Sequence, residues 1–155
     1  MRHTRLAATV AAMIAAAGVA APASASPPTD ASASLDLPAG VACPFPLRLD
    51  FTGKSKTINL PGGRMIITSP GLKVTVTNTA SGRSVDLNIT GAQQVITRED
   101  GATETVATGH NLLLDPVAGF VHTSGRFSFV FDAAGNLIQP LQGQGTTTDV
   151  CAVLS

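Results

Sequence analysis

The stretch LKVTVTNTASGRSVDLNIT, residues 72–90, determines the fold class of this 155-residue chain. Apolar Leu72, Val74 and Val76 alternate with polar residues, and the alternation resumes at Val85 after the polar cluster TASGR. Alternation with a period of two is typical of half-buried β-strands, and a glycine within a short polar cluster is typical of a turn. The stretch therefore predicts a β-hairpin with one buried face.

The same pattern recurs along the rest of the chain, where turn signals such as Pro61-Gly62-Gly63 separate short apolar or alternating segments. These segments are residues 47–51, 57–60, 64–68, 94–98, 103–108, 111–114, 126–131, 137–142 and 148–154. Strong helical periodicity is absent after residue 25. About nine or ten short strands at this spacing predict an all-β fold, either an antiparallel β-barrel or a β-sandwich.

The first 25 residues have the features of a secretory signal peptide. Two arginines precede an apolar run, and the small residues Ala23-Ser24-Ala25 follow it. The run is too short and too rich in alanine for a membrane anchor, so we expect no membrane span. Residues 26–40, rich in Pro, Ser and Ala, are predicted to be a flexible lead-in, and residues 41–155 a single β domain. The predicted location is secreted, either extracellular or associated with the cell envelope.

The chain contains two cysteines, Cys43 and Cys151, which flank almost the whole predicted domain. In an exported protein such a pair predicts a disulfide bond, here tying the first strand to the last. Closing a loop on the order of 100 residues stabilises a fold by about 4 to 5 kcal/mol in the chain-entropy account. The alternative, a reactive thiol or a metal ligand, is disfavoured because the pair lacks CxxC spacing.

Charge and composition argue against nucleic acid as a partner. Without residues 1–25 the chain has eight Lys and Arg against ten Asp and Glu, a net charge of −2. Nucleic-acid binding depends on a basic surface, which this balance does not supply. The chain also has neither Trp nor Tyr, the side chains that commonly form stacking platforms for bases and sugars. No cofactor motif is complete, so no cofactor is predicted.

Phenylalanines are the candidate ligand-binding residues. Phe127, Phe129 and Phe131 alternate along one segment and should share one face of a strand, with Phe120 as a neighbour. One interpretation is that they belong to the solid core. The other is that they line an apolar cavity inside a barrel that holds a small hydrophobic ligand.

The stretch HNLLLDPVAGFVH begins at His110 and ends at His122, and a hairpin turn at its centre would place these two histidines opposite each other. A nearby carboxylate such as Glu104 would complete a zinc or copper site. Ser124 and Asp132 would instead complete a hydrolytic triad. The chain has neither HExxH nor GxSxG, so the pattern favours two strands and a turn, with no catalytic residue and two weak metal-ligand candidates.

Three segments, VACPFPLRLDF (residues 41–51), TSGRFSFVFDAAGNL (123–137) and TTTDVCAVL (146–154), carry a resemblance. The chain resembles small secreted proteins of actinobacteria whose function is uncharacterised, over roughly residues 41–155. The resemblance implies export from a high-GC Gram-positive cell and a β fold. It implies no activity, cofactor or catalytic residue.

Together these observations predict an exported, non-enzymatic β domain that acts by binding. The first hypothesis is a small apolar ligand held in a barrel interior. The second is a cell-envelope or protein-interaction module that acts through its outer faces. The third, less favoured, is a metal-binding protein or hydrolase that uses His110 and His122.

Overall fold

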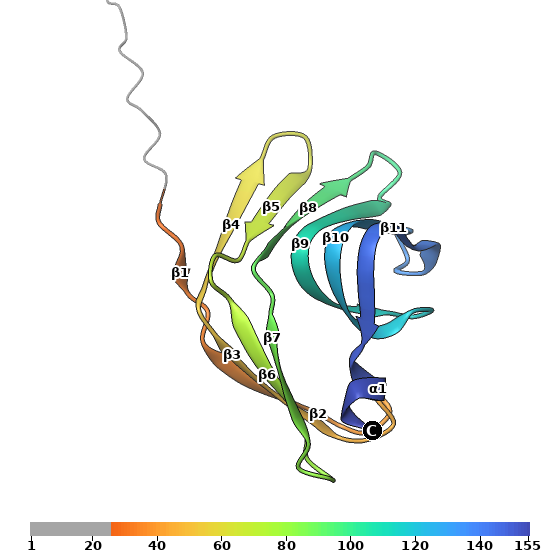
Figure 1. Cartoon of the computed structure of the whole chain (residues 1–155). Coiled ribbons are helices and arrows are strands. Elements are labelled where there is room, and N and C mark those ends of the chain that lie inside the picture. The colour runs from red at the N-terminus through yellow and green to blue at the C-terminus, as the bar shows by residue number, and fades with distance from the viewer. Residues whose placement is uncertain (1–25) are drawn as a thin grey trace, which may run out of the picture.

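The computed structural model describes residues 26–155, which form two antiparallel β-sheets and one short helix (Figure 1). The predicted signal peptide, residues 1–25, lies outside the described residues. The elements are β1 (Thr29–Asp30), β2 (Ala33–Leu37), β3 (Leu47–Thr52), β4 (Lys54–Leu60), β5 (Arg64–Thr68), β6 (Lys73–Asn78), β7 (Ser84–Asn88), β8 (Gly91–Thr97), β9 (Thr103–Asp115), β10 (Gly119–Phe131), β11 (Leu137–Asp149) and α1 (Val150–Leu154).

The chain alternates between the two sheets. The larger has the strand order β1-β4-β5-β8-β9-β10-β11 and the smaller β2-β3-β6-β7. Strand β3 continues into β4 after one residue, and β7 continues into β8 after two, so the chain passes directly from one sheet to the other. The all-β prediction is confirmed. The two sheets fit a sandwich and do not close into a barrel (Figure 1).

The hairpin predicted at residues 72–90 forms from β6 and β7, with Val74 opposite Leu87 and Val76 opposite Val85. Its apolar face and that of β3 form the main core, together with side chains from β10 and α1. The buried members of this core are Cys43, Leu47, Leu49, Val74, Val76, Ile89, Phe120, Val150 and Leu154. Burial of this apolar face against a second layer is the dominant stabilising term for such a sheet.

Part of the predicted flexible lead-in, residues 26–40, instead carries strands. Strand β2 pairs with β3, with Leu35 opposite Leu49 and Leu37 opposite Leu47. Leu37 also packs against the main core. The leucines at alternate positions supply a weak strand pattern, which the surrounding Pro, Ser and Ala conceal in the sequence.

Strands β9, β10 and β11 are each 13 residues long and bend sharply, forming what we call the arch (Figure 1). Four glycines lie in one row across the bend: Gly91 pairs with Gly109, Gly109 with Gly125, and Gly125 with Gly145. At Gly125 φ is +142°, and a Cβ atom would overlap the backbone of β11 at the Gln144 carbonyl oxygen. Only glycine permits such a close approach of backbones, so the row marks the bend.

The arch has a small core of its own. Ala107, Leu113 and Val121 are buried together, and Phe129 and Leu141 pack against them. Ala107 and Leu113 are six residues apart on β9, so a straight strand would separate them by about 20 Å. Because the two residues nevertheless belong to one cluster, the sheet bends towards this face, which is its concave face.

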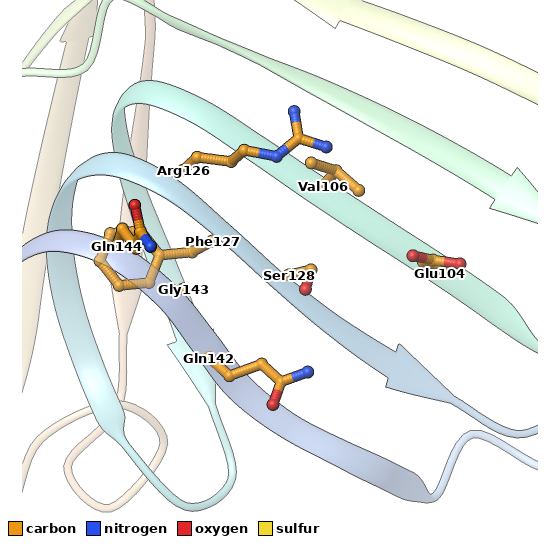
Figure 2. A pocket seen from close by; sticks show the side chains of 8 residues that line it. All are labelled: Glu104, Val106, Arg126, Phe127, Ser128, Gln142, Gly143 and Gln144. Atoms are coloured by element: carbon orange, nitrogen blue, oxygen red, sulfur yellow. The ribbon is translucent and has the colours of Figure 1, made fainter.

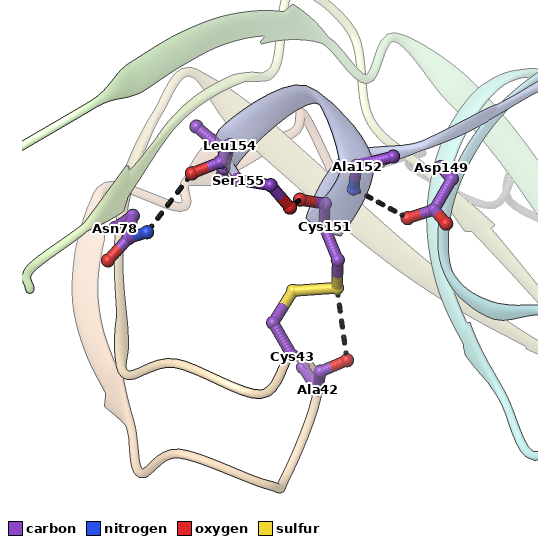
Figure 3. The surroundings of a disulfide bond; sticks show 8 residues. All are labelled: Ala42, Cys43, Asn78, Asp149, Cys151, Ala152, Leu154 and Ser155. Carbon is purple, nitrogen blue, oxygen red and sulfur yellow. Dashed lines mark hydrogen bonds between the residues drawn. A yellow bond between two sulfur atoms is a disulfide. The ribbon is translucent and has the colours of Figure 1, made fainter. Parts of the chain in front are cut away.

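A disulfide joins Cys43 to Cys151, with the Cα atoms 5.5 Å apart, as predicted (Figure 3). It does not join two strands, however, because Cys43 lies in the loop between β2 and β3 and Cys151 lies in α1. The predicted strand at residues 148–154 is wrong, since the Asp149 side chain accepts a hydrogen bond from the Ala152 N–H and caps a helix there (Figure 3). With five residues, α1 falls well short of a membrane-crossing helix, and it is the only helix in the described part of the chain.

Candidate functional site

A pocket of about 420 Å³ lies between the two ends of the arch. We call it the Phe131 pocket. Its walls come from three places: the loop before Cys43, the β9–β10 hairpin and the far end of β10. The lining residues are Val41, Ala42, Leu114, Asp115, Pro116, Gly119 and Phe131.

The bend in the arch creates this pocket. Gly119 and Phe131 are the first and last residues of β10, and a straight strand of this length would separate them by about 40 Å. Both nevertheless line the same pocket. The glycine row at Gly125 therefore positions the site, because it allows the strand to return towards its own beginning.

Large apolar side chains are exposed at the pocket. Val41 and Leu114, both in its wall, are 50% and 54% exposed, and Val117 in the hairpin turn is 76% exposed. Single exposed apolar residues are ordinary, whereas a group of them at the mouth of a pocket is typical of a binding site. Asp115 is the one charged residue in the wall.

The structure places the four candidate phenylalanines in different surroundings. Phe120 is part of the main core, and Phe129 packs in the arch core. Phe127 is buried and forms one wall of a different, polar pocket. Only Phe131 lines the Phe131 pocket, where its ring stands edge-on to that of Phe129 with centroids 5.8 Å apart. Because the sheets do not close, these rings do not surround a common barrel interior.

Figure 2 shows the polar pocket, about 400 Å³ in volume, which lies across β9, β10 and β11. Its walls are mainly amide, hydroxyl and charged groups: Glu104, Val106, Arg126, Phe127, Ser128, Gln142, Gly143 and Gln144. Glu104 is already engaged by Arg98, whose Nη2 lies 2.7 Å from its Oε2.

The two histidines stack, with ring centroids 5.6 Å apart and planes inclined by 11°. The predicted pairing of His110 with His122 is wrong by two positions, because the turn is centred on Val117 and not on Pro116, which places Ser124 opposite His110. His122 Nε2 lies 2.8 Å from the Asn88 carbonyl oxygen and so links β10 to β7. The Nδ1 atom of His110 is buried without a partner.

Neither the metal site nor the triad is assembled in the described residues. No group of three or more His, Cys, Asp or Glu side chains is placed there to hold a metal ion. Stacked imidazoles also direct their nitrogen lone pairs along parallel planes and not towards a common point. Asp132, the proposed third member of a triad, uses both carboxylate oxygens within its own turn.

Comparison of the chain with protein families, with curated proteins and with solved structures finds no match in any of the three.

Sequence patterns identified Phe131 but missed the other walls of its pocket. Val41 and Ala42 lie almost 90 residues from Phe131, and only the disulfide loop brings them there. Asp115 and Gly119 were recognisable as turn residues, with nothing to indicate a pocket beside the turn. A useful signal would have been the repeated glycines inside apolar segments, which are typical of sharply bent strands.

Proposed function

We propose that the protein is a non-enzymatic binding protein that holds a small apolar molecule in the Phe131 pocket. The observation that carries this proposal is the pocket itself, about 420 Å³ in volume and mostly apolar, with exposed Val41 and Leu114 in its wall. Binding would remove these side chains from water, at roughly 25 cal/mol per Å² of apolar area. The ligand position differs from a barrel interior, since it lies between the ends of the arch.

The proposed function includes export of the protein from the cytosol. The Cys43–Cys151 disulfide is consistent with an oxidising environment outside the cytosol. The features of residues 1–25 support a cleaved signal peptide. An exported binding protein would meet its ligand in the medium or at the cell envelope.

Fluorescence of N-phenyl-1-naphthylamine, an apolar probe, tests the proposal directly. The chain has no Trp or Tyr, so protein emission does not interfere. We expect saturable binding to the wild type and about a tenfold weaker affinity for Leu114→Ser, because one apolar contact of about 1.4 kcal/mol is lost. Leu35→Ser is the matched control, since Leu35 is 48% exposed on β2 and lies outside the pocket. Absence of saturable binding, or equal loss in both variants, contradicts the proposal.

A second candidate function, a protein or envelope interaction module, is favoured by β11. This strand is the edge of the larger sheet and pairs with β10, and it carries no charged residue before Asp149. An edge strand without charged side chains can pair with an added strand from a partner, whereas charged side chains on an edge strand oppose such pairing. Retention of the protein in the envelope fraction, lost in the Thr147→Lys variant, would support this function; equal release of both into the medium would contradict it.

A further inference from the structure

Asp115 stands out among the pocket residues because half of its carboxylate has no partner. The residue is 4% exposed. Its Oδ1 accepts hydrogen bonds from the Val117 N–H at 2.8 Å and the Ala118 N–H at 2.7 Å, which hold the hairpin turn. Its Oδ2 is buried and accepts no hydrogen bond in the described structure.

Asp132 provides a matched comparison, because it holds another tight turn in the same way. Its Oδ1 accepts from the Ala134 and Asn136 N–H groups, and its Oδ2 accepts from the Asn136 side-chain amide at 2.9 Å. Both oxygens of Asp132 are therefore satisfied locally. At Asp115, by contrast, Oδ1 alone accepts the hydrogen bonds that hold the turn, and Oδ2 takes no part in the turn.

No cation in the described residues compensates Asp115. The ion pairs found there join Arg48 to Asp36 and Asp50, and Arg98 to Glu104. A buried carboxylate oxygen without a donor is unfavourable, and a charged donor relieves that cost better than a neutral one. The group that suits this position is therefore a cationic N–H donor.

The structure also leaves open space at Gly119, the residue opposite Asp115. Gly119 lies directly opposite Asp115 in the β9–β10 ladder and lines the same pocket. A Cβ atom built on Gly119 would have no atom within 4 Å. Cross-strand partners normally cover one another, so the missing side chain leaves room for part of a ligand beside Asp115.

We propose that the ligand of the Phe131 pocket carries a protonated amine on an apolar body. The ammonium group would pair with the charge of the Asp115 carboxylate in the pocket wall, while the apolar part contacts Phe131 and Leu114. This inference rests on the proposed function, because it names the ligand class of the same pocket. It distinguishes apolar amines from fatty acids, which the carboxylate would repel.

Two ligands with the same apolar body test the inference, 4-phenylbutylamine and 4-phenylbutan-1-ol, each titrated calorimetrically at pH 7. We expect the wild type to bind the amine at least tenfold more tightly than the alcohol. Asp115→Asn should abolish this preference, because it removes the charge that attracts the ammonium group, while the Asn side-chain oxygen still accepts from Val117 and Ala118 and holds the turn. Asp132→Asn, which changes the same residue type in a turn outside the pocket, should keep the preference.

Each result decides between the two proposals. Equal affinity of the wild type for amine and alcohol overturns the amine inference and leaves the apolar site standing. A preference that survives in Asp115→Asn also overturns the inference. If the wild type binds neither compound, the proposed function itself fails. The wild-type comparison needs no variant, so it decides the question even if Asp115→Asn does not fold.

Discussion

The core between the two sheets contains nine buried apolar residues, whereas the arch contains a cluster of three. Both regions are built from the same alternating strands. The main core is closed by α1 and by the disulfide. Its shape therefore follows from the burial of apolar side chains from both sheets. The arch depends on a row of glycines that lets its strands fold back. The comparison shows that burial stabilises this protein while backbone geometry shapes its pocket.

The largest expected effect concerns the main core. Replacing both cysteines, Cys43→Ser with Cys151→Ser, should lower the free energy of unfolding by about 4 to 5 kcal/mol, because the unfolded chain regains the freedom of a loop of 108 positions. Urea denaturation of the oxidised wild type and the double variant measures this difference. A loss below about 1 kcal/mol would mean that the disulfide is not what closes this end of the sandwich.

The next effect concerns the bend of the arch. In Gly125→Ala the new Cβ would meet the Gln144 carbonyl oxygen and the Gly145 Cα at a backbone φ of +142°. We expect a loss of roughly 3 kcal/mol from strain and overlap together, measured by urea denaturation.

Gly135→Ala is the control for that variant. Gly135 also has a positive φ, +84°, but a Cβ there would meet no atom within 4 Å. Its expected cost is the backbone term alone, about 1 kcal/mol. Equal losses in the two variants would show that close approach of the strands is not what requires glycine at the bend.

A third experiment compares the two cores with the same substitution. Leu47 in the main core is 1% exposed, and Leu113 in the arch core is 8% exposed. Leu47→Ala should cost about 3 kcal/mol and Leu113→Ala about 2 kcal/mol, because the thinner arch core relaxes more easily around the deleted side chain. The thermal midpoints of the two variants provide the measurement. A larger loss for Leu113→Ala would reverse the assignment of the main stabilising core.

The smallest effect concerns acid stability and the surface carboxylates of the two regions. Hydrogen bonds from Ser34 and then from Arg48 lower the pKa of Asp50 on the smaller sheet, and bonds from the Asn136 side chain and backbone lower the pKa of Asp132 beside the arch. A carboxylate with a lowered pKa contributes stability above its ordinary value of 3.8, which is lost as the pH falls through the lowered pKa.

Asp50→Asn and Asp132→Asn should each slightly reduce this acid-side loss of stability. Because both carboxylates are solvent-exposed, the reduction should be small in each case. Urea denaturation between pH 2.5 and 6 measures it, and a steeper acid dependence in either variant would contradict the assignment.

Much of the fold was predictable from local patterns. The hairpin at residues 72–90 has the expected partners, and the cysteines are joined as expected. The predicted segments 103–108 and 111–114 are, however, one strand, β9. Gly109 lies between them, and a glycine inside an apolar segment is compatible with both a turn and a bend.

The candidate site was predictable only in part. Phe131 was identified, but the placement of Phe120 in the main core and of Phe127 at the polar pocket was not, because alternation assigns a face to a residue without saying what that face contacts. The stacking of the histidines also depends on the hairpin register, and a turn centred on Val117, one residue beyond the expected centre, shifts the pairing by two positions. A local pattern does not specify the position of a turn with that accuracy.

The sequence by itself determined the strand-rich fold, the buried face of the 72–90 hairpin and the pair of cysteines, because period-two alternation and cysteine count are local or compositional properties. Only the tertiary structure decided that four glycines, distant in the chain, would lie in one row. Only it decided that Asp115 would lie in the wall of a pocket with Phe131. Both depend on strand register and on the bend of the sheet, which arise when strands pair and pack together.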